Sequence, residues 1–161
     1  MKKLLLVSVL LVCMLVAAGA MAAELPQAGD QINGFTVVET RDFPLIDATI
    51  VRFEHDRTGA EVFYIVNDDV NRVFDLVFRT TAVDNTGLPH VFEHATLSGS
   101  EKYPSTKLFF NLSYQTYNSY MNASTYDIMT SYPVASYSEA QLAEARGFLY
   151  RQLPASHGAG E

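Results

Sequence analysis

Two histidines and a glutamate stand close together in the run His90-Val91-Phe92-Glu93-His94. On a helix, positions i and i+4 lie on one face, about 6 Å apart along the axis. Two imidazoles at that spacing can bind one Zn²⁺, which lowers the pKa of a water molecule from ~15.7 to roughly 7. Glu93 projects from nearly the same face and can take up the proton. The run therefore has the inverted form of the usual zinc-protease motif and predicts metal-assisted hydrolysis.

The alternative is a helix whose histidines only cap the chain or form hydrogen bonds. The surrounding sequence favours the metal, because the motif begins just after Pro89, in the first turn of the expected helix. The other histidines, His55 and His157, stand at the end of a strand and in an unpatterned tail, so we expect no metal role for either.

The first residues of the chain have the layout of a secretory signal peptide. A short basic start is followed by an apolar run over residues 4–18 and by small residues at alternate positions in 20–22. We expect cleavage of residues 1–22, no stable membrane span after it, and export to the periplasm or the extracellular space. One metallopeptidase domain over residues 23–153 should follow, with a disordered tail over 154–161.

Composition limits the other classes of function. The chain has 161 residues, a net charge of −7 and 48% hydrophobic residues, which suits one globular domain. The negative charge argues against nucleic acid as a partner, because proteins that bind it usually carry a basic patch. The only cysteine, Cys13, has no second cysteine to pair with, so no disulfide forms within the chain.

Alternating and periodic apolar residues predict the elements that position the motif. Residues 34–40 read as a strand, and residues 47–55 and 61–66 as a hairpin. Residues 73–78 are apolar at nearly every position, as in a strand covered on both faces. A helix should begin at Pro89, run to residue 98 and stop at Gly99.

The second half of the chain continues with helices and strands. We expect a short helix over residues 107–112 and strands over 120–123 and 128–134. Ser138 and Gln141 have the form of a capping box, and the helix that follows has the apolar stripe Leu142, Ala145, Phe148 and Leu149. This order predicts an α+β fold with a mostly antiparallel sheet packed by helices.

Several segments resemble one known family. Residues 86–94 and 98–104 around the motif, and residues 118–126 and 131–136 after it, are similar to the pitrilysin/insulinase superfamily of zinc metallopeptidases. The presequence-protease branch is the nearest, and the resemblance covers roughly residues 33–153. Several motifs in the same order are more specific than the five-residue signature alone.

The resemblance implies roles for individual residues. It makes His90 and His94 ligands of Zn²⁺ and Glu93 the general base. It also implies that an edge strand pairs with the backbone of a bound peptide, and that unfolded or short peptides are the substrates. The residues of that strand would be Asn122, Ala123 and Ser124.

This chain departs from the family in one respect. The family's third zinc ligand is a glutamate on a later helix, expected beyond Glu161, and Glu144 lies one helix too early to replace it. We therefore expect an N-terminal fragment that lacks a C-terminal half and is weak or inactive alone. The alternative is a non-catalytic homologue of the same fold that binds peptides or a partner chain.

Overall fold

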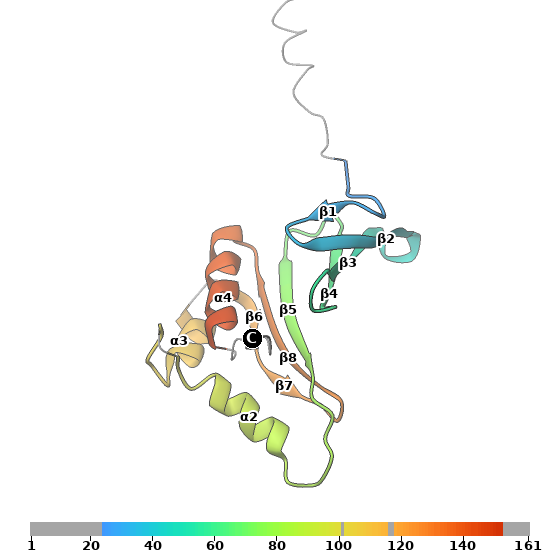
Figure 1. Cartoon of the computed structure of the whole chain (residues 1–161). Helices are drawn as coiled ribbons and strands as arrows, with labels where there is room; N and C mark the ends of the chain where they lie inside the picture. Colours follow the sequence, from blue (N-terminus) through green and yellow to red (C-terminus); the bar gives the residue numbers. More distant parts are fainter. Residues whose placement is uncertain (1–23, 101, 116–117, 153–161) are drawn as a thin grey trace, which may run out of the picture. The chain divides into compact units, whose positions relative to one another are not determined.

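The structure is a computed structural model, and it describes residues 24–100, 102–115 and 118–152 (Figure 1). The chain is α+β and its strand pairs are antiparallel, as the sequence predicts. Within these described ranges, no helix is both long enough and apolar enough to cross a membrane.

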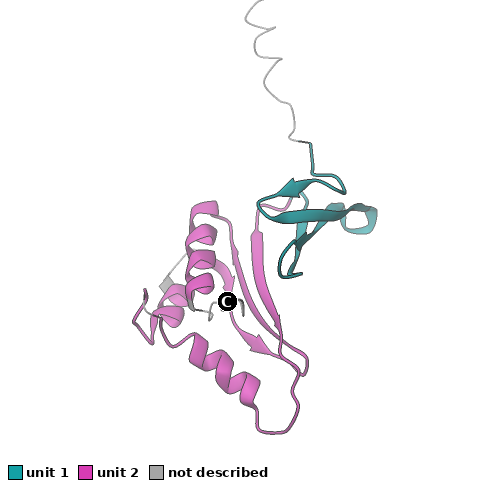
Figure 2. Ribbon diagram, viewed as in Figure 1, with its two compact units in different colours: residues 1–68 teal, residues 69–161 magenta. Residues whose placement is uncertain are grey.

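The chain divides into two compact units, residues 1–68 and residues 69–161 (Figure 2). The single domain expected over residues 23–153 spans both of them and stays a prediction. The proposed signal peptide over residues 1–22 and the tail over 154–161 lie outside the described residues.

Unit 1 is one antiparallel sheet in the strand order β1-β2-β3-β4. The turn between β1 and β2 is Asn33-Gly34, and both residues have positive φ, 52° and 81°. This is the backbone of a type I′ hairpin turn, which an Asn-Gly pair favours. The elements are β1 (Gln31–Ile32), β2 (Phe35–Phe43), a 3-10 turn (Pro44–Ile46), β3 (Ala48–His55) and β4 (Glu61–Val66).

Unit 2 contains the motif and consists of a second antiparallel sheet with helices. The strand order is β5-β8-β6, and the short β7 also pairs with β8. Figure 1 shows α4 beside the face of this sheet and α2 close to β7. The elements are β5 (Arg72–Arg79), α2 (Leu88–Thr96), α3 (Leu108–Gln115), β6 (Asn118–Met121), β7 (Ser124–Thr125), β8 (Met129–Ser136) and α4 (Glu139–Gln152).

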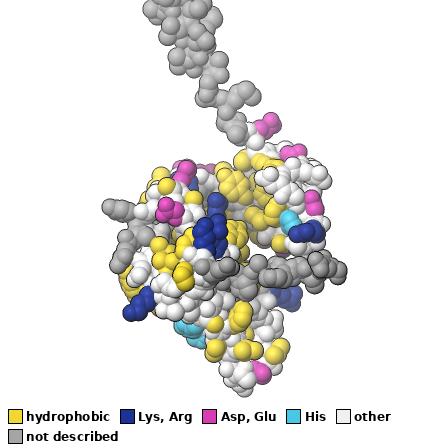
Figure 3. Space-filling model, turned by 60° about the vertical axis from the view of Figure 1, so that its left-hand side comes forward, with side chains coloured by type: hydrophobic (Ala, Val, Ile, Leu, Met, Phe, Trp, Pro, Cys, Tyr) yellow, Lys and Arg dark blue, Asp and Glu magenta, His cyan; other side chains and the backbone are white. Residues whose placement is uncertain are grey.

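The expectation that the strand at residues 73–78 is covered on both faces is wrong. Phe74 and Leu76 pack against the core of unit 2, and the ring of Phe74 contacts Tyr150 on α4. On the other face, Val73 and Val77 are 65% and 51% exposed. The strand is the edge of its sheet, and hydrophobic side chains remain at the molecular surface (Figure 3). An unbroken apolar run therefore does not establish burial of both faces.

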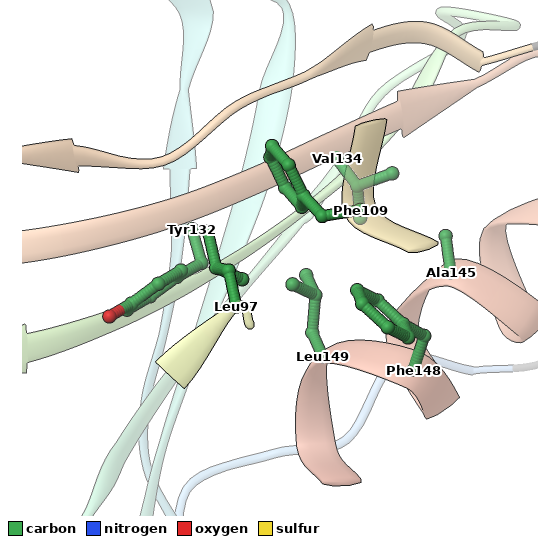
Figure 4. Packing of buried hydrophobic residues seen from close by; sticks show 7 residues of the cluster. All are labelled: Leu97, Phe109, Tyr132, Val134, Ala145, Phe148 and Leu149. Carbon is green, nitrogen blue, oxygen red and sulfur yellow. The ribbon is translucent and has the colours of Figure 1, made fainter. Parts of the chain in front are cut away.

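The core of unit 2 joins the helices to β8. Figure 4 shows Phe148 and Leu149 pointing from α4 toward Leu97 and Phe109. Leu149 and Val134 have no exposed surface, so this cluster excludes water. The stripe expected on the last helix is confirmed, because its members lie in or against this core. They are Leu142, Ala145, Phe148 and Leu149.

Candidate metal centre

Helix α2 begins at Leu88, one residue before the expected start, and ends at Thr96, two residues before the expected end at residue 98. Gly87 has a φ of 68° just before the first turn, and Pro89 occupies that turn, where no backbone N–H is needed. The backbone nitrogen of His90 donates to the Gly87 carbonyl at 3.0 Å. Leu97 is the C-cap, and Gly99, three residues past the last helical residue, has a φ of 123°, a conformation that favours glycine. The helix is therefore one short, well-defined segment that carries the motif.

The two histidines of the motif face one another. Nε2 of His90 and Nε2 of His94 are 3.2 Å apart, and the ring centroids are 4.9 Å apart. Both residues are exposed, so an ion could reach them from solvent. In a tetrahedral zinc site, with Zn–N bonds of about 2.0–2.1 Å, two nitrogens stand about 3.3 Å apart. The spacing of this pair fits that requirement.

Glu93 points to the sheet side of the helix. Its side chain is only 5% exposed, and Oε2 accepts a hydrogen bond of 2.6 Å from the hydroxyl of Thr125 on β7. A buried carboxylate with a hydroxyl donor is held in one orientation. The structure thus separates the three motif residues into an exposed imidazole pair and a buried acid beside it.

A cavity of about 240 Å³ brings the motif together with the following segments of unit 2. Its wall is mixed and includes the imidazole pair and Glu93 from α2 and aromatic rings from α3. Asn122 and Ala123, expected to bind substrate, also line it, whereas Ser124 does not. The lining residues are His90, Glu93, His94, Leu97, Ser98, Thr106, Phe109, Phe110, Asn122 and Ala123.

The backbone between β6 and β7 continues the edge of the sheet. The nitrogen of Asn122 donates to the Pro133 carbonyl on β8 at 3.1 Å, and Ser124 is in register with Ser131. Neighbouring residues of a strand direct their N–H and C=O groups to opposite sides. The N–H and C=O of Ala123 therefore point away from β8, toward the outer edge.

Glu144 does not belong to the cavity. It lies on α4, is exposed, and is not part of the wall. Within the described residues, no three side chains of His, Cys, Asp or Glu come together so that they could hold a metal ion. Glu93 lies beside the histidine pair without joining it in a three-residue group.

The sequence did not reveal the polar contacts that hold α2 against the sheet. The hydroxyl of Thr96 donates to the Glu93 carbonyl at 2.7 Å and lies 3.2 Å from the Tyr132 hydroxyl. Burial raises the pKa of Tyr132 above its usual value, and the charge of Glu93 adds to the rise. The only signal in the sequence was the presence of a threonine and a tyrosine at these positions. Such residues are too common for their spacing to predict this contact.

Comparisons with known proteins find relatives that are peptidases. No family model matches the chain. It is 42% identical over 125 residues to the mitochondrial presequence protease of Gibberella zeae, covering 74% of this chain and 12% of that protein. Against the mitochondrial presequence protease of Mus musculus the identity is 40% over 110 residues, covering 68% and 11%. The chain thus spans about an eighth or less of the length of these relatives.

The fold has a counterpart among solved structures. A crystal structure of pitrilysin matches with a TM-score of 0.58 and 21% sequence identity, over 79% of this chain and 13% of that chain. This likeness confirms the expected type of fold. Its short coverage agrees with the expectation that the chain corresponds to part of a longer peptidase.

The predicted export to the periplasm or the extracellular space is wrong. The relatives found in several organisms, including Emericella nidulans and Xenopus tropicalis, are mitochondrial proteins. A basic start followed by an apolar run is a pattern of composition, and it did not identify the compartment. The residues that carry that pattern lie outside the described part of the chain.

Proposed function

Because the chain belongs to the pitrilysin/insulinase family of peptidases, we propose that it supplies the zinc-binding helix of a metalloendopeptidase. His90 and His94 would hold Zn²⁺, and Glu93 would be the general base. One observation carries the proposal: two imidazole nitrogens 3.2 Å apart share a cavity with a buried carboxylate. The activity of the whole protein is part of the same proposal, since the chain spans 12% or less of its relatives.

The chemistry follows from where the side chains lie. Zn²⁺, when bound, lowers the pKa of water toward neutrality and polarises a carbonyl oxygen. Glu93 lines the same cavity, so its carboxylate can accept a proton from the attacking water and return it to the leaving nitrogen. The rings of Phe109 and Phe110 also line this cavity and give part of its wall an apolar character.

We propose peptides as substrates, held as an added strand. The outward N–H and C=O of Ala123 could pair with the backbone of an extended peptide, and Asn122 stands beside them in the cavity wall. Ser124 would continue the strand. Backbone hydrogen bonds do not depend on which side chains the peptide carries, so this mode of binding suits unfolded or short peptides of varied sequence.

The third ligand is proposed to come from outside this chain. Two histidines alone bind zinc weakly compared with a three-residue site. The exposed apolar face of α2 also supports a further segment that covers it. Leu88, Val91 and Phe92 on this face are 66%, 63% and 53% exposed. A C-terminal half of the peptidase is the partner that would supply the ligand and cover this face. We therefore propose that the chain alone has weak or no activity.

A second function is favoured by the lack of a three-residue metal group among the described residues. The same edge strand could bind peptides or a partner chain without hydrolysing them. Such a homologue would retain its peptide affinity when a chelator removes all metal.

The experiment measures zinc-dependent cleavage of an internally quenched, unstructured peptide by the full chain, at a chain concentration high enough to detect the weak activity proposed for it. Glu93→Gln should lower kcat by about 10²–10⁴-fold while zinc stays bound, since general acid–base catalysis contributes that much. Glu144→Gln on the exposed face of α4 is the matched control and should leave the rate unchanged. Undiminished cleavage by Glu93→Gln would remove Glu93 from the mechanism, and chelator-resistant binding without cleavage would establish the second function.

A further inference from the structure

Thr125 on β7 donates a side-chain hydrogen bond to the carboxylate of Glu93 on α2. Its Oγ1 donates to Glu93 Oε2 at 2.6 Å, in a part-buried setting. The donor itself is fixed, because Thr125 is paired with Thr130 on the central strand β8. A short hydrogen bond to an ionised acceptor is among the stronger kinds. The orientation of Glu93 is therefore set by the sheet rather than by the helix that carries it.

In this orientation the Glu93 carboxylate does not face the histidine pair as a third zinc ligand would. Carboxylate oxygens are ordinary zinc ligands, and Glu93 is one residue from His94 and three from His90. A glutamate free to turn could complete the donor set of the pair. Instead, the described residues contain no group of three potential ligands, although Glu93 lines the same cavity as the histidines.

We infer that Thr125 is a positioning residue that keeps Glu93 from becoming a zinc ligand and so reserves it for proton transfer. The inference rests on the proposed function, because it concerns the same metal position. A ligated carboxylate would have a lone pair committed to the ion and would be a poorer proton acceptor. The hydrogen bond from Thr125 thus leaves metal binding to the histidines and keeps Glu93 available for proton transfer.

The test is the zinc affinity of the purified full chain, measured by competition with a chromophoric chelator. Thr125→Val keeps the shape of the side chain and removes the hydroxyl. It should tighten zinc binding by about tenfold, the lower end of the effects that outer-shell partners have on metal affinity. Thr125→Ser keeps a hydroxyl and should bind zinc as the natural chain does. Damage to the fold would instead weaken binding, so the sign of the change is informative.

A double substitution identifies the source of the gain. Glu93→Gln combined with Thr125→Val should lose the extra affinity, because an amide is a much poorer zinc ligand than a carboxylate. Thr125→Ala serves as a second route should the valine variant fail to fold, which circular dichroism would reveal. The inference is overturned by unchanged or weaker binding in a folded Thr125→Val chain, by a gain that persists without the carboxylate, or by no binding in either chain.

The affinity measurement also separates this inference from the proposed function. If the natural chain cleaves no peptide but Thr125→Val tightens zinc binding through Glu93, the peptidase proposal fails for this chain and the positioning role stands. If cleavage depends on Glu93 but Thr125→Val leaves zinc affinity unchanged, the peptidase proposal stands and the positioning role is wrong. In an active chain, Thr125→Val should also lower kcat more than it changes KM.

Discussion

The phenol of Tyr132 on β8 is a hydrogen-bond donor to Thr96 on α2. The two oxygens are 3.2 Å apart, and the single hydroxyl hydrogen of Thr96 is already given to the Glu93 carbonyl at 2.7 Å. The hydrogen between the two hydroxyls must therefore come from Tyr132. This chain of contacts ties the backbone of Glu93 to the central strand β8.

Removing the phenol oxygen should loosen helix α2. Tyr132→Phe keeps the ring in the core and deletes one intramolecular hydrogen bond, so we expect a loss of about 0.5–1.5 kcal/mol in the free energy of unfolding. Urea denaturation followed by circular dichroism measures it. Tyr137→Phe is the control, since Tyr137 is 65% exposed, and should change stability far less. Equal effects in the two variants would mean that the contact to Thr96 contributes nothing.

Alkaline pH should destabilise the chain through the same residue. The pKa of Tyr132 is raised, first by burial, so the folded chain holds this proton more tightly than the unfolded chain. The resulting stability is fully present below about pH 10, the ordinary tyrosine pKa, and is lost as pH rises through the higher folded-state pKa. Unfolding free energies measured across this range should fall less steeply in Tyr132→Phe. Parallel pH profiles for the two chains would contradict this account.

The core between α4 and the sheet should dominate the stability of unit 2. Leu149 has no exposed surface and packs with Phe148 and Val134. Leu149→Ala should cost about 2–5 kcal/mol, the range for deleting a buried leucine side chain. Leu45→Ala removes the same atoms from a residue that is 99% exposed, and should cost little. Thermal unfolding of the two variants provides the comparison, and similar midpoints would contradict the assigned core.

Local sequence patterns predicted the elements of the fold, but not every surface they bury. The hairpin of β3 and β4 and the proline in the first turn of α2 depend on turn residues and short-range periodicity, and both are confirmed, although α2 starts at Leu88 and ends earlier than expected. The Asn33-Gly34 turn carried an equally clear signal and was missed. The exposure of Val73 and Val77 on one face of β5 could not be predicted from the local sequence. It depends on whether segments far apart in the sequence pack against that face.

The site shows the same division between local and distant information. Helical spacing alone predicted that His90 and His94 would meet, and their nitrogens are 3.2 Å apart. The contact of Glu93 with Thr125 joins residues 32 positions apart and depends on the register of β7 against β8. Register is set by the whole sheet, so no window of sequence around the motif contains it.

Zinc binding should require both histidines of α2 and no other histidine among the described residues. With Nε2 atoms 3.2 Å apart, His90 and His94 would together supply two nitrogen donors to an ion, and removing either leaves a single donor. His90→Ala and His94→Ala should each abolish one-to-one zinc binding, measured at equilibrium by competition with a chromophoric chelator. His55→Gln is the matched control, because that ring packs on Phe35 and its Nδ1 contacts Thr58 in unit 1. Retained zinc in either alanine variant, or its loss in His55→Gln, would place the metal elsewhere.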